Sequence, residues 1–263
     1  EQAETQRVQD SISVVEAEVA AQRATDTVVM PEKEIEAEVP QMDSIEMALR
    51  DSLEKITNQK RFGSFADATI GETALHTIEN DFVKLTLSNK GGAPVMAELK
   101  NYVTFDSMPL YLFDKETSEM NFNFWMSKSQ EIDSRDLYFV PVAEEMNDTR
   151  AVYRMYGDSK DQYVELRYEV QPGESYLIDA EVSVVGMDDV LDASEGQFEL
   201  DWAIQAPFHE RSLKQDQQKT TVFYQHFDEK ADYISESNYE VEKFEAAVQW
   251  VAFKQQFFSA VLI

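Results

Sequence analysis

Three histidines, His76, His209 and His226, are the residues of this chain best suited to proton transfer near neutral pH. An enzyme that exchanges a proton at a sugar carbon needs groups that gain and lose protons in this range, and a histidine pair with a carboxylate meets that need. His209, His226 and a glutamate could take these roles, as in a sugar epimerase built on a β-sandwich. The alternative is that both histidines lie in surface loops and have no catalytic part.

Other kinds of reactive site are not encoded. The sequence has no glycine-rich phosphate loop, nucleophile elbow, zinc-binding helix or calcium loop. It also has no cysteine, so disulfides, thiol nucleophiles and thiolate metal sites are excluded. We therefore predict no catalytic residue, no cofactor and no metal site, and we do not expect an enzyme.

The end of the chain carries a second distinctive group, in which aromatic and amide side chains follow one another closely. Its apolar residues fall at helical intervals, but two strands separated by residues 254–256 fit equally well. They could form a surface that faces a partner or a membrane, or they could belong to the core of a fold that continues past Ile263. We predict partner contact or structural support for Trp250, Phe253, Gln255, Gln256, Phe257 and Phe258.

The elements that position such residues begin only after a clear compositional boundary. All 16 Phe, 11 Tyr and 3 Trp lie at or beyond Phe62, and the first glycine is Gly63. A packed interior needs bulky apolar side chains, and tight turns need glycine. We therefore predict an acidic segment with no aromatic residue over residues 1–61 and a folded domain over residues 62–263.

The acidic segment is too polar to offset its loss of conformational entropy by burial, so residues 1–41 are expected to form a mostly disordered tether. A short helix is predicted over residues 43–58. Asp43 to Glu46 has the spacing of a helix-capping box, and Ile45, Leu49, Leu53 and Ile56 follow at near-helical intervals.

The domain shows the period-two alternation of β-strands. Apolar residues alternate with charged ones at residues 164–170 and 178–184, and turn residues lie between these runs. Asn89 to Gly92 predicts a hairpin turn after a strand at residues 83–87. Another strand is predicted at 198–204, with weaker signals at 137–142, 151–155 and 221–224. Because no helical pattern alternates with the strands, the fold class is all-β, a large antiparallel sandwich.

The net charge of the chain limits the classes of partner that it can bind. Its 51 acidic and 23 basic residues give a net charge of −28. Such a surface repels phosphate backbones and anionic lipid headgroups, so nucleic acid is not expected as a partner. No apolar run reaches the length of about 20 residues that crosses a bilayer. Glu1 is expected to mark a processing or cloning boundary, since no initiator Met or signal peptide precedes it.

Several blocks in the same order resemble the periplasmic domain of bacterial YidC-type membrane protein insertases, in a form similar to Bacteroidetes members. The resemblance covers residues 75–263. Its most specific block is the aromatic run at 250–258, and the others are Asn80 to Gly92, Glu98 to Tyr102, Asp136 to Phe139, Val185 to Asp189 and Leu200 to Trp202.

This resemblance implies a β-supersandwich similar to galactose-mutarotase folds, incomplete at its C-terminal end in this chain. It implies a non-catalytic scaffold or docking surface at the periplasmic face of the bacterial inner membrane. Membrane-spanning segments outside this chain would anchor it. The implied partners are Sec translocon accessory subunits and nascent membrane proteins. No catalytic residue of the family maps onto this domain, and the sugar-binding or epimerase-like sandwich remains the alternative.

Overall fold

The computed structural model describes residues 41–126, 130–191, 198–235 and 241–263. The chain divides into two compact units, Glu1–Arg50 and Asp51–Ile263. The predicted tether lies outside the described residues except at its last position. The division between Arg50 and Asp51 lies within a helix, eleven positions before the compositional boundary between residues 61 and 62.

This helix, α2, runs over Gln41–Phe62, where the sequence predicts a shorter helix at 43–58. A 3-10 helix, η1 (Gly63–Thr69), follows and brings Phe65 into the interior, where it is fully buried. The Phe65 ring meets the Phe124 ring edge to face at 5.4 Å between centroids. None of the helices in the described ranges is long and apolar enough for a membrane crossing.

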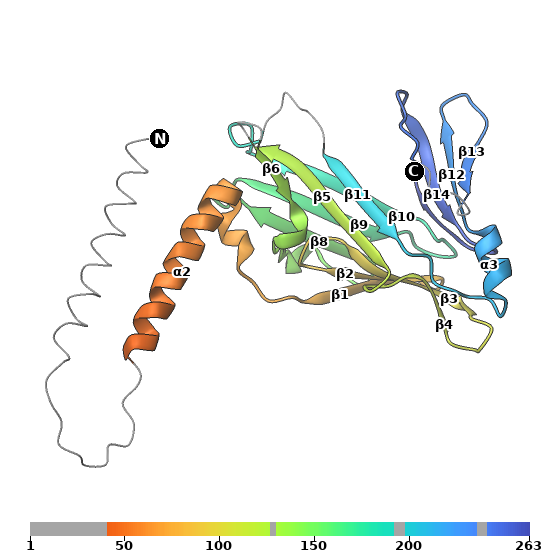
Figure 1. The fold of residues 1–263 in the computed structure, drawn as a ribbon, viewed down its shortest axis with the longest axis horizontal. Helices are drawn as coiled ribbons and strands as arrows, with labels where there is room; N and C mark the ends of the chain where they lie inside the picture. Colours follow the sequence, from red (N-terminus) through yellow and green to blue (C-terminus); the bar gives the residue numbers. More distant parts are fainter. Residues whose placement is uncertain (1–40, 127–129, 192–197, 236–240) are drawn as a thin grey trace, which may run out of the picture. The chain divides into compact units, whose positions relative to one another are not determined.

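The strands from β1 to β11 form three antiparallel sheets (Figure 1). The first has the order β1-β2-β3-β4 and consists of β1 (Leu75–Glu79), β2 (Val83–Ser88), β3 (Pro94–Val103) and β4 (Pro109–Phe113). The second has the order β10-β9-β8-β7 and consists of β7 (Val140–Pro141), β8 (Arg150–Tyr156), β9 (Tyr163–Val170) and β10 (Ile178–Val185). The third has the order β11-β5-β6 and consists of β5 (Ser118–Met126), β6 (Gln130–Asp133) and β11 (Glu199–Ile204).

A fourth sheet contains the end of the chain. Its order is β13-β12-β14-β15, and it consists of β12 (Thr221–His226), β13 (Asp232–Ser235), β14 (Val248–Lys254) and β15 (Ser259–Leu262). A short helix, α3 (Leu213–Lys219), precedes it, and the 3-10 turns η2 (Ser134–Asp136) and η3 (Ala143–Glu145) flank β7. The many antiparallel strands confirm the predicted all-β fold class.

One core joins the first three sheets. On β9 the four apolar residues of the alternating pattern, from Val164 to Val170, are all at most 3% exposed. They pack with alternate residues of β2, β5 and β8 in a single cluster that also takes in Phe65. Successive side chains of a strand point to opposite faces, so period two in the sequence becomes burial of one face.

The turn between β2 and β3 is the hairpin turn that the sequence predicts. Gly91 and Gly92 have φ of +80° and +67°, a region that other residues enter only with strain. A Cβ on Gly92 would lie 2.5 Å from Leu166 Cδ1 and 3.0 Å from the Phe139 ring. The Gly92 carbonyl also accepts a 2.9 Å hydrogen bond from the Tyr168 hydroxyl. Glycine is therefore needed here for conformation and for space.

Asn80 joins the β1–β2 turn to the segment between β9 and β10. Its Oδ1 accepts hydrogen bonds from the backbone N–H groups of Phe82 and Val83, both at 2.8 Å. Its Nδ2 donates to the carbonyls of Gln171 and Ser175, both at 2.7 Å. One amide therefore satisfies two donors and two acceptors of the backbone, which ties turns of two sheets together.

Some elements differ from the sequence-based prediction. Residues 137–142 are not one strand, since only Val140–Pro141 form β7. Residues 137–139 instead form backbone hydrogen bonds with the β2–β3 turn. Gly91 N–H donates to the Leu137 carbonyl, and Phe139 N–H donates to the Asn89 carbonyl, both at 2.8 Å. The choice left open for the chain end is also resolved, because residues 248–254 and 259–262 are strands.

Gly92→Ala is expected to destabilise the protein by about 3 kcal/mol, because the new methyl group adds overpacking to the strain of positive φ. Gly173→Ala is the matched control. Gly173 has φ of +79°, but its added Cβ would meet nothing within 4 Å. It should lose only about 1 kcal/mol, the conformational part. Urea unfolding of both variants measures the difference, and equal losses would contradict the close approach.

Candidate docking site

The six residues singled out near the chain end belong to the β14–β15 hairpin. Trp250 and Phe253 lie on β14, and the other four form the turn at residues 255–258. The register pairs Lys254 with Ser259, and Gln255 N–H donates to the Phe258 carbonyl at 2.8 Å, which closes the turn. The structure thus brings all six into one local element.

Four of the six make defined contacts within the protein. The Phe253 ring meets the Trp202 ring of β11 at 5.1 Å, and the Phe258 ring meets the Tyr102 ring of β3 at 5.0 Å. Gln255 is buried and its Nε2 donates to the Pro207 carbonyl. Trp250 Nε1 donates to Gln225 Oε1 on the neighbouring strand β12 at 3.0 Å. Phe253, Gln255 and Phe258 therefore join the fourth sheet to the rest of the Asp51–Ile263 unit.

Phe257 is different, because it is 68% exposed. Gln256 beside it is half-buried. A small, mostly apolar hollow opens near the hairpin, and none of its lining side chains is titratable. The lining residues are Leu112, Ile204, Ala206, Phe253, Gln255 and Ala260. An apolar lining of this kind offers no group for acid–base catalysis.

The histidines do not form the pair that an epimerase would use. His209 is buried rather than in a surface loop: its Nε2 lies 2.6 Å from the Tyr111 carbonyl, and its backbone N–H donates to Asp216 Oδ2. His226 lies on β12, where its Nδ1 is 3.2 Å from the Ala247 carbonyl. In the described part of the chain the two histidines have different neighbours, and each ring uses one nitrogen on a backbone carbonyl.

Metal binding is not supported either. Across residues 41–126, 130–191, 198–235 and 241–263, no group of three or more His, Asp or Glu side chains is arranged to hold a metal ion. His209, in the loop before α3, and Asp216, within α3, instead have structural roles. The Ser212 hydroxyl caps α3 by accepting from the Gln215 N–H, and His209 docks on the Phe258 ring.

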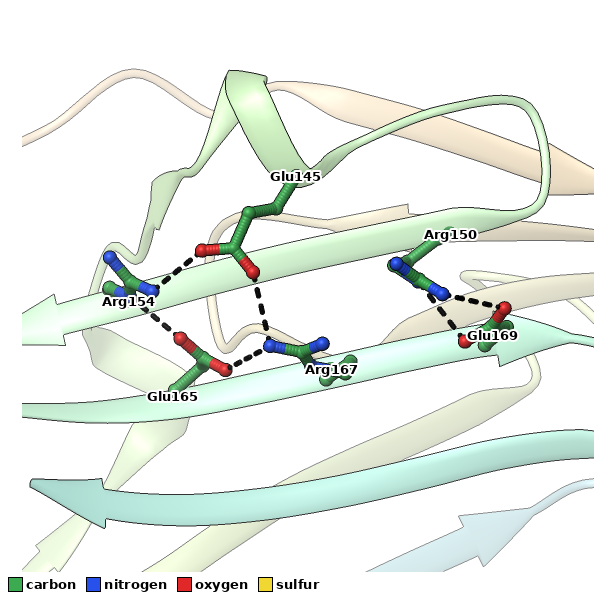
Figure 2. A network of polar contacts seen from close by, with 6 residues as sticks. All are labelled: Glu145, Arg150, Arg154, Glu165, Arg167 and Glu169. Carbon is green, nitrogen blue, oxygen red and sulfur yellow. Dashed lines mark hydrogen bonds and ion pairs between the residues drawn. The ribbon is translucent and has the colours of Figure 1, made fainter.

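The outer face of β8 and β9 carries a network of ion pairs (Figure 2). Arg154 Nε donates to Glu165 Oε2 at 2.7 Å, and Arg167 Nη2 donates to Glu165 Oε1 at 3.0 Å. Glu145, from η3, reaches over the strands and accepts from both arginines, at 2.8 and 3.1 Å. Two carboxylates and two guanidinium groups thus form a closed ring.

Burial makes Glu165 the central member of this ring. Its side chain is 9% exposed, compared with 35% for Glu145. Burial acts to raise the Glu165 pKa, but hydrogen bonds and positive charge from Arg167 and Arg154 outweigh it and hold the pKa below its ordinary value of 4.5. The hydrogen bond to Glu165 in turn raises the pKa of Arg154. The Glu165 carboxylate and the Arg154 guanidinium therefore each stabilise the charged form of the other.

A second pair, Arg150 and Glu169, lies on the same face. Arg150 donates two hydrogen bonds to Glu169, at 3.0 and 2.9 Å, and both side chains are 36% exposed. The alternation at residues 164–170 predicts charged side chains on one face of a strand, but it does not predict their pairing into this network. The antiparallel register places Arg150 opposite Glu169 and Arg154 opposite Glu165. The sequence signal for such pairing is the opposite charge of residues in the two neighbouring strands.

A family model and several relatives of this chain all indicate the same protein family. A family model described as the YidC periplasmic domain matches residues 75–263, the stretch from the first residue of β1 to the chain end. A relative from Bacteroides fragilis, named membrane protein insertase YidC, is 32% identical over 258 residues, which is 98% of this chain and 38% of the relative. Proteins of the same name from Parabacteroides distasonis and Cytophaga hutchinsonii are 29% and 30% identical over 93% and 82% of this chain.

The chain is much shorter than these relatives. It spans 38% of the length of the Bacteroides fragilis protein, 39% of the Parabacteroides distasonis protein and 34% of the Cytophaga hutchinsonii protein. The matched region coincides with the β-sheets, and it includes the β14–β15 hairpin and the ring of ion pairs.

Phe253→Ala is expected to cost about 2 kcal/mol of unfolding free energy, because it removes the half-buried ring that packs on Trp202. Phe257→Ala should change stability by less than about 0.5 kcal/mol, since the exposed ring loses few contacts on truncation. Chemical denaturation of both variants tests this division. A loss at position 257 as large as that at 253 would show that the exposed ring also supports the fold.

The Glu165 carboxylate should make stability depend on acid pH. Because its folded-state pKa is lowered, its contribution is present above the ordinary value of 4.5 and is lost as pH falls through the folded-state pKa. Glu165→Gln should cost about 2 kcal/mol at neutral pH and flatten the fall in unfolding free energy as the pH drops below 4.5.

Glu169→Gln is the control for this prediction, because its ion pair with Arg150 is more exposed and so better screened by water. The hydrogen bond from Arg150 lowers the Glu169 pKa as well, but because this pair is more exposed the variant should lose less stability and flatten the acid-pH profile less than Glu165→Gln. Denaturant unfolding at a series of pH values measures both variants. The assignment of Glu165 as the central carboxylate is wrong if the two profiles coincide.

Proposed function

Because the chain belongs to the YidC periplasmic domain family, we propose that it acts as a non-catalytic scaffold and docking module in membrane protein insertion and folding. Its place would be the periplasmic face of the bacterial inner membrane, in a parent protein that spans this membrane several times. The observation that carries the proposal is the match over residues 75–263, which covers every β-strand of the described chain.

The geometry supports a binding role over a catalytic one. The two histidines that the sequence suggests as a catalytic pair are engaged in structural contacts: His209 with backbone groups and Phe258, and His226 with Ala247. Function resides in the site rather than in the fold, so a sandwich similar to mutarotases does not bring mutarotase chemistry. A sheet face whose charges are paired, as on β8 and β9, is suited to presenting a fixed surface.

The partners proposed are nascent membrane proteins and accessory subunits of the Sec translocon. The relatives are named membrane protein insertases, which supports the first. The net charge of −28 supports contact with basic segments, since complementary charge speeds encounter and selects partners. Within the hairpin, Phe257 is the residue proposed to meet a partner, and Phe253, Gln255 and Phe258 are proposed to support the hairpin. Trp250 and Gln256 would complete that support.

Removal of residues 75–263 from the encoding gene tests the proposal in the cells that produce the protein. Newly made inner-membrane proteins should become protease-protected more slowly, because the scaffold that holds insertion components together is lost. Sec accessory subunits should copurify with the intact protein and not with the shortened one. Normal insertion together with unchanged copurification would overturn the proposal, and restoring the intact gene controls for indirect effects.

A further inference from the structure

Large apolar side chains are exposed together on three loops of the Asp51–Ile263 unit. Three lie in the turn between β3 and β4 or beside it, two lie before and at the start of α3, and one lies in the β14–β15 turn. Each is between 51% and 68% exposed, and together we call them the apolar loop patch: Val103, Phe105, Met108, Phe208, Leu213 and Phe257.

Contacts between the loops bring these residues to one place. Phe105 N–H donates to the His209 carbonyl at 3.2 Å, which joins the β3–β4 turn to the loop that carries Phe208. The His209 ring meets the Phe258 ring at 6.0 Å, next to Phe257 in the β14–β15 turn. Figure 1 shows the β3–β4 turn, α3 and the end of β14 close together.

The β3–β4 turn is held in a fixed shape. Thr104 N–H donates to the Met108 carbonyl at 2.9 Å, and Met108 N–H donates to the Thr104 hydroxyl at 3.1 Å. Ser107 closes the turn with φ of +67°. A fixed turn loses little conformational entropy on binding, so its exposed apolar side chains are pre-organised for a surface.

The charge around the patch differs from that of the chain. Residues 102–108, 205–214 and 254–258 contain three basic side chains, Arg211, Lys214 and Lys254, and two acidic ones, Asp106 and Glu210. The chain as a whole has 51 acidic and 23 basic residues. Surface charges farther away than about 10 Å are largely screened at physiological salt, so the local balance governs contact with an anionic surface.

We propose that the apolar loop patch inserts into the headgroup region of a lipid bilayer. The patch consists of side chains at turns and loops, and none of them lines the hollow beside Phe253, where an apolar peptide side chain could bind. A bilayer needs no groove. Phenylalanine side chains can enter its interface, while Arg211, Lys214 and Lys254 at the edge of the patch meet anionic headgroups. The inference rests on the proposed function, which holds this domain at a membrane.

Vesicle flotation with the whole 263-residue chain tests the inference. Vesicles of phosphatidylethanolamine with phosphatidylglycerol should carry the protein upward in a density gradient. Phe105→Ser and Phe257→Ser should each weaken binding about tenfold, and the double variant about a hundredfold, because each removes an apolar ring from the interface. Phe227→Ser is the matched control: Phe227 is 59% exposed, compared with 60% for Phe105, but it lies outside the patch.

A label provides a second measurement that does not depend on removing a ring. The chain has no cysteine, so Phe105→Cys and Phe227→Cys each create one site for an environment-sensitive fluorophore. The label at position 105 should shift to shorter wavelength when vesicles are added, and the label at 227 should not. Circular dichroism and thermal unfolding of every variant check that the fold is retained.

Four other outcomes overturn the inference. Failure of the parent chain to bind vesicles does so, as does equal loss in Phe105→Ser and Phe227→Ser. Binding that requires phosphatidylglycerol but ignores the patch variants would indicate attraction by charge alone. Self-association that the patch variants abolish, without vesicle binding, would make a second copy the occupant. Vesicle binding with normal insertion after removal of residues 75–263 would reject the proposed function and retain the bilayer contact.

Discussion

The close approach of the β2–β3 turn to β9 is the constraint on which the arrangement of the β unit depends. The backbone at Gly92 lies against Leu166 and Phe139 with no room for a side chain, and its carbonyl is fixed by the Tyr168 hydroxyl. Residues of β9 face this turn and belong to the same core cluster as β2, β5 and β8. A close-packed interior transmits a local displacement to its neighbours, so the position of this one turn sets how the first two sheets meet.

The Asp51–Ile263 unit has two kinds of surface, a sheet face with paired charges and a group of loops with exposed apolar rings. On the outer face of β8 and β9, each partly buried charge has a partner, and Glu145 covers the pair of strands from η3. Paired charges with few free groups are suited to keeping a sheet face rigid and solvated. At the loops of β3–β4, α3 and β14–β15, apolar rings are exposed and the charges nearly balance. Exposed apolar patches of this kind mark contact surfaces in soluble domains.

The sequence predicts those parts of the fold in which one local pattern decides the outcome. Alternation from Val164 to Val170 and the glycine pair at 91–92 specify a half-buried strand and a hairpin turn. The sequence predicts less well the burial of side chains whose partners lie far away along the chain. On β5, Asn121 and Asn123 are buried because Asp201 of β11 accepts from Asn123, and Arg135 donates to Asn121. The helix α3 has one apolar residue, and its only local signal is the capping spacing from Ser212 to Gln215. The role of Phe253 and Phe258 depends on Trp202 and Tyr102, which no local pattern reveals.

The fourth sheet is attached to the others through a few aromatic and amide contacts, and this has a consequence for local opening. Its most buried members, Tyr224, Ala252, Gln255 and Ala260, are 6–9% exposed, whereas Ala151, Val152 and Met155 of β8 are fully buried. Segments with fewer buried contacts open at lower free energy than the centre of a core. Backbone amides of β12, β14 and β15 therefore exchange hydrogen with water through smaller fluctuations than those of β8 and β9. We therefore expect a graded cooperativity, in which the hairpin that carries Phe257 opens at lower free energy than the central sheets.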